Sequence, residues 1–244
     1  MNMNLQTAQN ILITGCSKGI GLKLVELLLS VNDKRRVFAT CRKPENATQL
    51  QDLLQLYPDR LKIDSLDVSQ EETIKTYVEK MKNQNVKFHI LINNAGTFSP
   101  NRFETLLNAT KQDMLSVYET NCIGPLLMVQ HLYNNHCFED GAIVANVSSG
   151  MASINRTNRP RKRVSYCCSK TALNMLTKMM SIELEGHVYA FAIHPGWVKT
   201  DTGTDKAPLT TQEAVPGIIK LLDDFTPETH NGKFFQYDGS VLNW

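Results

Sequence analysis

The chain has 244 residues, of which 42% are hydrophobic and 20% are charged, and its formal net charge is +2. These values predict a folded globular protein and argue against disorder and against a strong general attraction to nucleic acid. No apolar run reaches the ~18 residues that a membrane span needs, and the polar N-terminus does not resemble a signal peptide. We therefore expect a cytoplasmic protein with no membrane and no nucleic-acid partner.

Short β-rich runs alternate with longer amphipathic segments along the chain. The predicted strands are 11–14, 37–40, 61–65, 89–92, 142–147, 188–193 and 233–236. Helical patterns lie near 19–30, 46–56, 70–83, 111–136, 164–185 and 211–224. Continuously apolar strands separated by helices indicate a parallel sheet covered on both faces. We expect one α/β domain over residues 1–244, a doubly wound Rossmann fold of about seven strands with ligands at their carboxyl ends.

The six cysteines contain no CxxC pair and show no metal-ligand spacing with the histidines. This pattern predicts reduced thiols and no metal site.

A glycine-rich turn, 14–21, connects the first predicted strand to the first predicted helix. Its glycines would let the backbone approach a pyrophosphate, whose charge the helix N-terminus favours. The spacing Gly-x-x-x-Gly-x-Gly differs from both the GxGxxG fingerprint and the P-loop, so a simple tight turn is the alternative. The candidate contacts are Gly15, Ser17, Lys18, Gly19, Ile20 and Gly21.

The end of the second strand bears on the choice of cofactor. NAD-binding sheets carry an acid there for the ribose 2′-hydroxyl, but this chain has Cys41 followed by Arg42, and Lys18 could approach the same pocket. Two cations and no carboxylate suit a 2′-phosphate and predict NADP(H). A solvated strand end is the alternative.

Further candidate nucleotide contacts follow the later strands. Asp67 could accept a hydrogen bond from adenine or instead begin a turn. Small residues after the fourth strand fit a backbone that passes close to a ligand. These candidates are Asn93, Ala95 and Gly96, and those after the sixth strand are Pro195, Gly196, Val198 and Thr200.

Tyr166 and Lys170 are one helical turn apart at the start of an apolar-periodic segment. A cation beside a tyrosine lowers the phenol pKa, and such a phenol could give or take a proton at a carbonyl oxygen. A surface pair of the two side chains is the alternative.

These motifs, in this order, resemble the short-chain dehydrogenase/reductase family. The glycine turn, Asp67, the Asn93–Gly96 run, Asn121, Ser148-Ser149, the Tyr166/Lys170 pair and Pro195 through Thr200 carry the resemblance, and the ending 232–244 is similar to the sniffer-type carbonyl reductases and bacterial C-factor proteins. The resemblance implies an NADPH-dependent carbonyl reductase. Tyr166 would be its general acid, Ser149 would orient the substrate, and Lys170 would hold the ribose and lower the pKa of Tyr166.

Two assignments within the resemblance have alternatives. Pro125 cannot donate to the carbonyl of Asn121, so that carbonyl could anchor a water between Lys170 and solvent, unless the proline only kinks the helix. Ser149 follows the fifth strand directly, as the family's serine motif does, whereas Ser153 fits the shorter serine–tyrosine spacing of many members.

Other features leave the function open. The basic cluster 159–163 suits a solvated loop or the attraction of an anionic substrate. An NADP(H)-binding regulatory protein is a second function class. An extended-type epimerase or dehydratase is a third, but the region after Thr200 leaves little room for the substrate domain of such an enzyme. Family members self-associate through helices resembling 111–136 and 164–185, which implies a homodimer or homotetramer.

Overall fold

A single sheet contains all the strands of the described chain, in the order β3-β2-β1-β4-β5-β6-β7-β8. The computed structural model describes residues 3–31, 34–101, 103–157, 162–201 and 203–244. The strands are β1 (Asn10–Thr14), β2 (Arg36–Cys41), β3 (Leu61–Ser65), β4 (Phe88–Asn93), β5 (Phe138–Val147), β6 (Val188–His194), β7 (Phe234–Gln236) and β8 (Val241–Leu242). Strands β1 to β7 pair in parallel, and β8 is antiparallel to β7.

The strand order reverses beside β1, which pairs with β2 on one side and β4 on the other. In a doubly wound sheet, ligands bind outside the carboxyl ends of the strands at this reversal. The α/β Rossmann architecture predicted from the sequence is confirmed. The sheet has an eighth strand that the prediction missed, because two residues are too few to show a periodic pattern.

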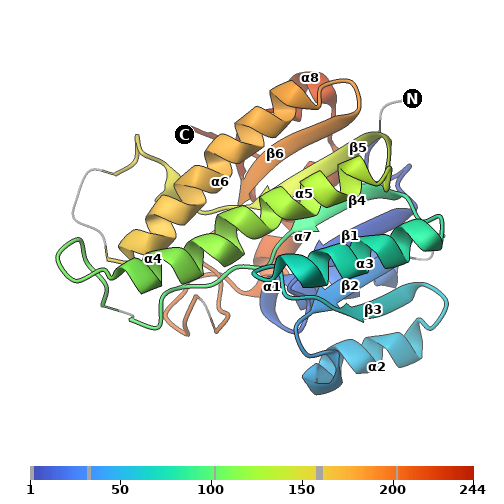
Figure 1. Ribbon diagram of the computed structural model, residues 1–244, viewed down its shortest axis with the longest axis horizontal. Helices are drawn as coiled ribbons and strands as arrows, with labels where there is room; N and C mark the ends of the chain where they lie inside the picture. Colours follow the sequence, from blue (N-terminus) through green and yellow to red (C-terminus); the bar gives the residue numbers. More distant parts are fainter. Residues whose placement is uncertain (1–2, 32–33, 102, 158–161, 202) are drawn as a thin grey trace.

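Helices cover both faces of the sheet (Figure 1). They are α1 (Gly19–Ser30), α2 (Thr48–Leu56), α3 (Glu71–Asn83), α4 (Lys111–Tyr118), α5 (Gly124–Asn134), α6 (Val164–Glu183), α7 (Thr211–Asp223) and the short α8 (Pro227–His230). Helices α1 and α7 pack against each other on one face, and α3, α5 and α6 lie on the other. None of the helices in the described ranges has the length and apolar character to cross a bilayer.

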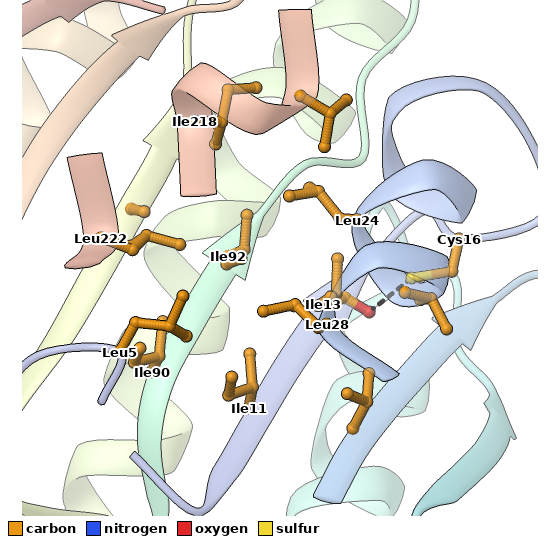
Figure 2. Packing of buried hydrophobic residues seen from close by; sticks show 14 of the residues in the cluster. Leu5, Ile11, Ile13, Cys16, Leu24, Leu28, Ile90, Ile92, Ile218 and Leu222 are labelled. Carbon is orange, nitrogen blue, oxygen red and sulfur yellow. Dashed lines mark hydrogen bonds between the residues drawn. The ribbon is translucent and has the colours of Figure 1, made fainter. Parts of the chain in front are cut away.

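The core follows from the alternation of side chains along the central strands. Ile11 and Ile13 of β1 point to the face covered by α1 and α7, and Leu12 points to the opposite face. Figure 2 shows the first of these clusters, in which Leu24 of α1 and Ile218 of α7 close over β1 and β4. Two buried apolar layers therefore hold the sheet rigidly beneath its carboxyl edge.

One predicted helix, 111–136, is divided in the structure. A π-helical turn, η2 (Glu119–Ile123), separates α4 from α5, and the N–H of Gly124 bonds to the carbonyl of Glu119 five residues earlier. Pro125 follows directly and has no N–H to continue the α-helical ladder. The proline marks the wide turn in the sequence, but the apolar pattern runs through it without a break.

Candidate active site

A cleft of about 1110 Å³ opens along the carboxyl ends of the strands. Its lining includes the first residues beyond β3, β4, β5 and β6, which are Leu66, Asn94, Ser148 and Pro195. Most of the sequence-predicted site residues line it: Gly15, Ser17, Lys18, Gly19, Ile20, Arg42, Asp67, Ala95, Gly96, Ser149, Tyr166, Lys170, Pro195, Gly196, Val198 and Thr200. Gly21, Asn93 and Asn121 do not, and each lies just behind the surface of the cleft.

The glycine turn packs tightly against the segment after β4. A Cβ on Gly15, whose φ is 73°, would lie 2.8 Å from the Cα of Ala95. One on Gly21 would lie 2.3 Å from the carbonyl oxygen of Gly15. Asn94, which the sequence analysis did not select, donates from Nδ2 to the Thr14 carbonyl at 2.8 Å. Gly21 thus shapes the turn from within and has no surface toward the cleft.

Arg42 and Asp67 line the cleft beyond the glycine turn, and Lys18 lines it from within that turn. Arg42 is exposed, and the neighbouring Cys41 is buried. Lys18 forms an exposed ion pair with Asp201 from the opposite rim. The carboxylate of Asp67 accepts from the N–H of Ser69 at 3.0 Å and from its hydroxyl at 2.8 Å. Asp67 therefore both begins a turn and faces the cleft.

Two buried asparagines connect the elements behind the cleft. Nδ2 of Asn93 donates to Oδ1 of Asn146 on β5 at 2.9 Å. Asn121, in the π-helical turn, accepts from the N–H of Thr97 at 2.8 Å and donates to its carbonyl at 2.9 Å. Its Nδ2 also lies 3.1 Å from Oγ of Ser169 on α6. The side chain of Asn121 thus ties the segment after β4 to the helix that carries Tyr166 and Lys170.

Tyr166 lies in the first turn of α6, partly exposed to the cleft, which Ser149 also lines. Burial raises the pKa of Tyr166 to about 12, and the neighbouring Ser149 hydroxyl and the positive charge of Arg163 oppose that rise. Arg163, three residues before the tyrosine, is a cation that lowers this pKa. The expectation that Lys170 lowers it as well stays a prediction.

Lys170 is buried beneath the cleft, and its Nζ donates to the Val147 carbonyl at 2.7 Å. Removal from water lowers the pKa of Lys170 to about 8. A Cβ placed on Gly96 would lie 3.5 Å from this Nζ, so the ammonium borders the backbone after β4. Spacing along α6 correctly predicted a shared site for the two side chains, but the ammonium contacts the end of β5.

The two candidate serines have different surroundings. Ser149 lines the cleft, and its Oγ accepts from the N–H of Met151 at 3.1 Å. Ser153 is fully buried and donates to the Asn243 carbonyl at 2.7 Å, away from Tyr166. The geometry therefore favours Ser149 over Ser153 as the partner of the tyrosine.

The segment after β6 forms the wall opposite the glycine turn. A Cβ on Gly19 would meet Cγ2 of Thr200 at 3.1 Å, which places Thr200 against that turn. His194, at the end of β6, also lines the cleft, and burial lowers its pKa to about 4. Its Nδ1 accepts from the N–H of Gly196 at 3.3 Å, so the ring stays neutral and supports the turn.

Comparison with known proteins places this architecture. The family model described as short chain dehydrogenase matches residues 9–209, which include the cleft residues from the glycine turn to Thr200. The chain belongs to the short chain dehydrogenase family. An oxidoreductase of Schizosaccharomyces pombe is 32% identical over 248 residues, covering 94% of this chain and 96% of the relative.

Among solved members of the short chain dehydrogenase family, the NADPH-bound carbonyl reductase from chicken fatty liver is similar with a TM-score of 0.87 and 36% identity, covering 97% of this chain and 99% of that one. The carbonyl reductase Sniffer of Drosophila melanogaster has a TM-score of 0.86 and 30% identity, covering 97% and 99%. The C-signal protein of Myxococcus xanthus is 36% identical over 159 residues, which is 64% of this chain and 92% of the relative. The resemblance to sniffer-type and C-factor proteins is confirmed.

Three residues that surround the start of α6, which are Phe98, Glu104 and Arg163, were not identified from the sequence. Glu104, fully buried, accepts from the Ser165 hydroxyl at 2.6 and 2.7 Å and from its N–H at 3.1 Å. The Phe98 ring lies 4.0 Å from the Tyr166 ring, centre to centre, and the Arg163 guanidinium also lies over the Phe98 ring. Arg163 was noted only as part of the basic cluster, whose residues 159–161 lie outside the described ranges. No local pattern in the sequence marks Glu104 as a buried residue.

Proposed function

We propose that this protein is an NADPH-dependent reductase of aldehydes, ketones or quinones. The observation that carries the proposal is that Ser149, Tyr166 and Lys170 line one cleft, which also contains a glycine turn at a helix N-terminus. Likeness to two carbonyl reductases, one of them with NADPH bound, supports the same reaction class.

The cofactor end of the cleft fits a phosphorylated dinucleotide. Gly15 and Gly21 stand where a Cβ would clash with Ala95 and with the Gly15 carbonyl, so the turn can be tight enough to approach a phosphate. No side chain caps the N-terminus of α1. Arg42 borders the cleft at the end of β2, where NAD-binding sheets carry an acid. Arg42 and Lys18 would hold a 2′-phosphate, and Asp67 would face the adenine. The segment from Pro195 to Thr200 would border the nicotinamide.

The tyrosine is in the protonation state that a reduction needs. A bound NADPH supplies the hydride to the carbonyl carbon. With a pKa near 12, the phenol of Tyr166 stays protonated at neutral pH and can donate its proton to the carbonyl oxygen as negative charge develops there. Ser149 donates a second hydrogen bond to that oxygen and so orients the carbonyl. The carbonyl substrate thus gains one hydride and one proton and becomes the alcohol.

Lys170 and Asn121 would return a proton to the tyrosine. Lys170 would also bind the nicotinamide ribose, which Tyr166 would contact as well. We propose that the main-chain carbonyl of Asn121 anchors a water between Lys170 and solvent, because Pro125 supplies no N–H to that carbonyl. The side chain of Asn121 holds the π-helical turn in place through Thr97 and Ser169.

Loss of NADPH absorbance with a panel of aldehydes, ketones and quinones tests the proposal. Turnover should occur in the wild type and fall at least about 100-fold in Tyr166→Phe, since general acid catalysis contributes at least that factor. NADPH affinity, measured by calorimetry, should change little in the mutant. Wild-type protein that binds NADPH tightly and reduces no member of the panel would refute a reductase.

That negative result would favour a second function, an NADP(H)-binding regulatory protein. The likeness to the C-signal protein of Myxococcus xanthus is the observation behind it. The placement of Ser149 and Tyr166 in the same cleft weighs against it, because a protein that only binds a cofactor has no need of a positioned acid.

We further propose that the chain forms a homodimer or homotetramer in the cytoplasm. The outer faces of α5 and α6 expose apolar side chains, which include Leu126, Tyr133, Met175, Met179 and Ile182. Light scattering during size-exclusion chromatography should give at least twice the 27.5 kDa chain mass, and Met175→Glu should lower it. A monomer at micromolar concentration would contradict this assembly.

A further inference from the structure

Positive charge gathers at the end of the cleft where Tyr166 lies. Arg156, Lys162 and Arg163, all from the segment between β5 and α6, line that end. The acidic residues among the described lining are Asp67 and Asp201. Asp201 also borders a smaller cavity with Arg163 but is paired with Lys18, and the carboxylate of Asp67 is held by Ser69 in the turn after β3. The substrate end is therefore cationic.

Arg163 is held in a fixed backbone geometry. It adopts a left-handed conformation, with φ 69° and ψ 51°, directly before α6. Its N–H donates to the Glu104 carbonyl at 2.7 Å, and the side chain of the same glutamate holds Ser165. Because Glu104 is fully buried, the backbone contact of Arg163 and the contacts of Ser165 two residues later are anchored in the interior. The arginine thus leaves the backbone at a defined point beside Tyr166.

The arginine side chain is stacked on an aromatic ring, and no carboxylate of the described chain pairs with it. Its Cζ lies 4.0 Å from the centre of the Phe98 ring, and that ring lies 4.0 Å from the Tyr166 ring. A stacked guanidinium has one face covered while its N–H edges remain able to bind a carboxylate in bidentate fashion. Lys162 lies similarly over Phe103, at 5.1 Å. Within the described ranges, no carboxylate lies at ion-pair distance from Arg163 or Lys162.

We propose that Arg163, supported by Lys162, is an anion subsite that selects carbonyl substrates bearing a carboxylate. This inference rests on the proposed reductase function and adds the substrate class. The distance from Arg163 Cζ to the centre of the Tyr166 ring cannot exceed twice 4.0 Å. A substrate of modest length can therefore bring its carbonyl to the phenol and its carboxylate to the guanidinium at the same time. A carboxylate separated from the carbonyl by a benzene ring or a chain of similar length fits within this span.

Two aldehydes of nearly equal shape test the subsite. The value of kcat/KM for 4-carboxybenzaldehyde should exceed that for its neutral methyl ester by about 10- to 100-fold, the range for hydrogen bonds to a charged group. The ratio should fall as salt is added, because screening weakens the attraction. In Arg163→Gln the ratio should approach one. Arg163→Lys should keep part of it, and Lys62→Gln, which removes an exposed cation on β3, should keep all of it.

The same variants separate the alternatives. If the wild type reduces both aldehydes with a ratio near one, the subsite is overturned while the reductase function stands. If Arg163→Gln weakens NADPH binding and leaves the ratio intact, Arg163 serves the cofactor and the inference is again overturned. The second result is physically possible because Arg163 also lines a smaller cavity, of about 300 Å³, with Lys18 and Arg42.

A binding measurement covers the case in which no aldehyde is reduced. Calorimetry would compare 4-(hydroxymethyl)benzoate with 4-(hydroxymethyl)benzamide on protein saturated with NADP+. Tighter binding of the benzoate that disappears in Arg163→Gln supports the anion subsite even if the reductase function fails. Equal binding of the acid and the amide overturns the subsite without reference to turnover.

Discussion

Replacing Glu104 should loosen the start of α6 and with it the position of Tyr166. The carboxylate accepts from the hydroxyl and the N–H of Ser165 in a fully buried site. Glu104→Gln keeps one oxygen acceptor, so it loses about one charge-assisted hydrogen bond and regains part of the cost of burying a charge, a net loss of about 2 kcal/mol. Glu104→Ala leaves both Ser165 donors unsatisfied and opens a cavity, for a loss of about 4 kcal/mol.

Urea unfolding and thermal melting measure these losses. For a chain of this size the glutamine variant should melt about 6 °C lower, and kcat should fall with little change in the Kd of NADPH. Glu79→Gln, on the exposed face of α3, is the matched control and should melt within about 1 °C of the wild type. A double-mutant cycle with Ser165→Ala should give a coupling of at least about 1 kcal/mol. Additive losses in that cycle would refute the reasoning.

Three further changes probe the cofactor and catalytic residues. Burial lowers the folded-state pKa of Lys170 to about 8, below the unfolded value of 10.5, so its protonated form costs stability at neutral pH and this cost is relieved as pH rises through that window. The unfolding free energy of the wild type relative to Lys170→Met should therefore rise by about 3 kcal/mol from about pH 7 to about pH 10.5, and a pH-independent difference would contradict the burial argument. Arg42→Asp should weaken NADPH binding at least about 10-fold and leave NADH binding equal or stronger, as read by fluorescence titration; parallel losses for both would remove Arg42 from the 2′-phosphate site. Gly21→Ala should destabilise the fold by about 1–3 kcal/mol and weaken NADPH binding, because its Cβ would lie 2.3 Å from the Gly15 carbonyl oxygen. Gly239→Asn, at a left-handed glycine with nothing within 4 Å, serves as the comparison, and equal effects at both positions would argue against the close approach.

Patterns within short stretches of sequence predicted those parts of the site that depend on short stretches of backbone. The glycine turn and the residues after each strand could be placed because every parallel strand ends at the same edge of the sheet. The tyrosine's electrostatic environment could not be predicted in this way. Spacing along a helix puts Lys170 one turn from Tyr166, but the direction of a long side chain depends on packing, and here Nζ reaches the Val147 carbonyl.

The contacts that sequence reasoning missed join residues far apart in the chain. Glu104 and Ser165 are separated by 61 positions, and neither belongs to a recognisable motif. A glutamate in a loop is most often solvated, so its burial depends on how the segment after β4 folds over α6. From the sequence, Arg163 likewise resembles a solvated cation in a loop, because its stacking on Phe98 depends on the tertiary fold.

The π-helical turn at Glu119–Ile123 limits which insertions and deletions the continuous helical segment from α4 to α5 can accept. Deleting one residue there would let ordinary four-residue hydrogen bonds close and make the segment more regular. It would also turn the side chains on one flank by about 100° relative to those on the other, since each α-helical residue advances the helix by that angle. Asn121 could then no longer reach both Thr97 and Ser169. A more regular helix would thus lose the contacts by which Asn121 ties the segment after β4 to α6. The extra residue disturbs the regularity of the helix, but the site requires it.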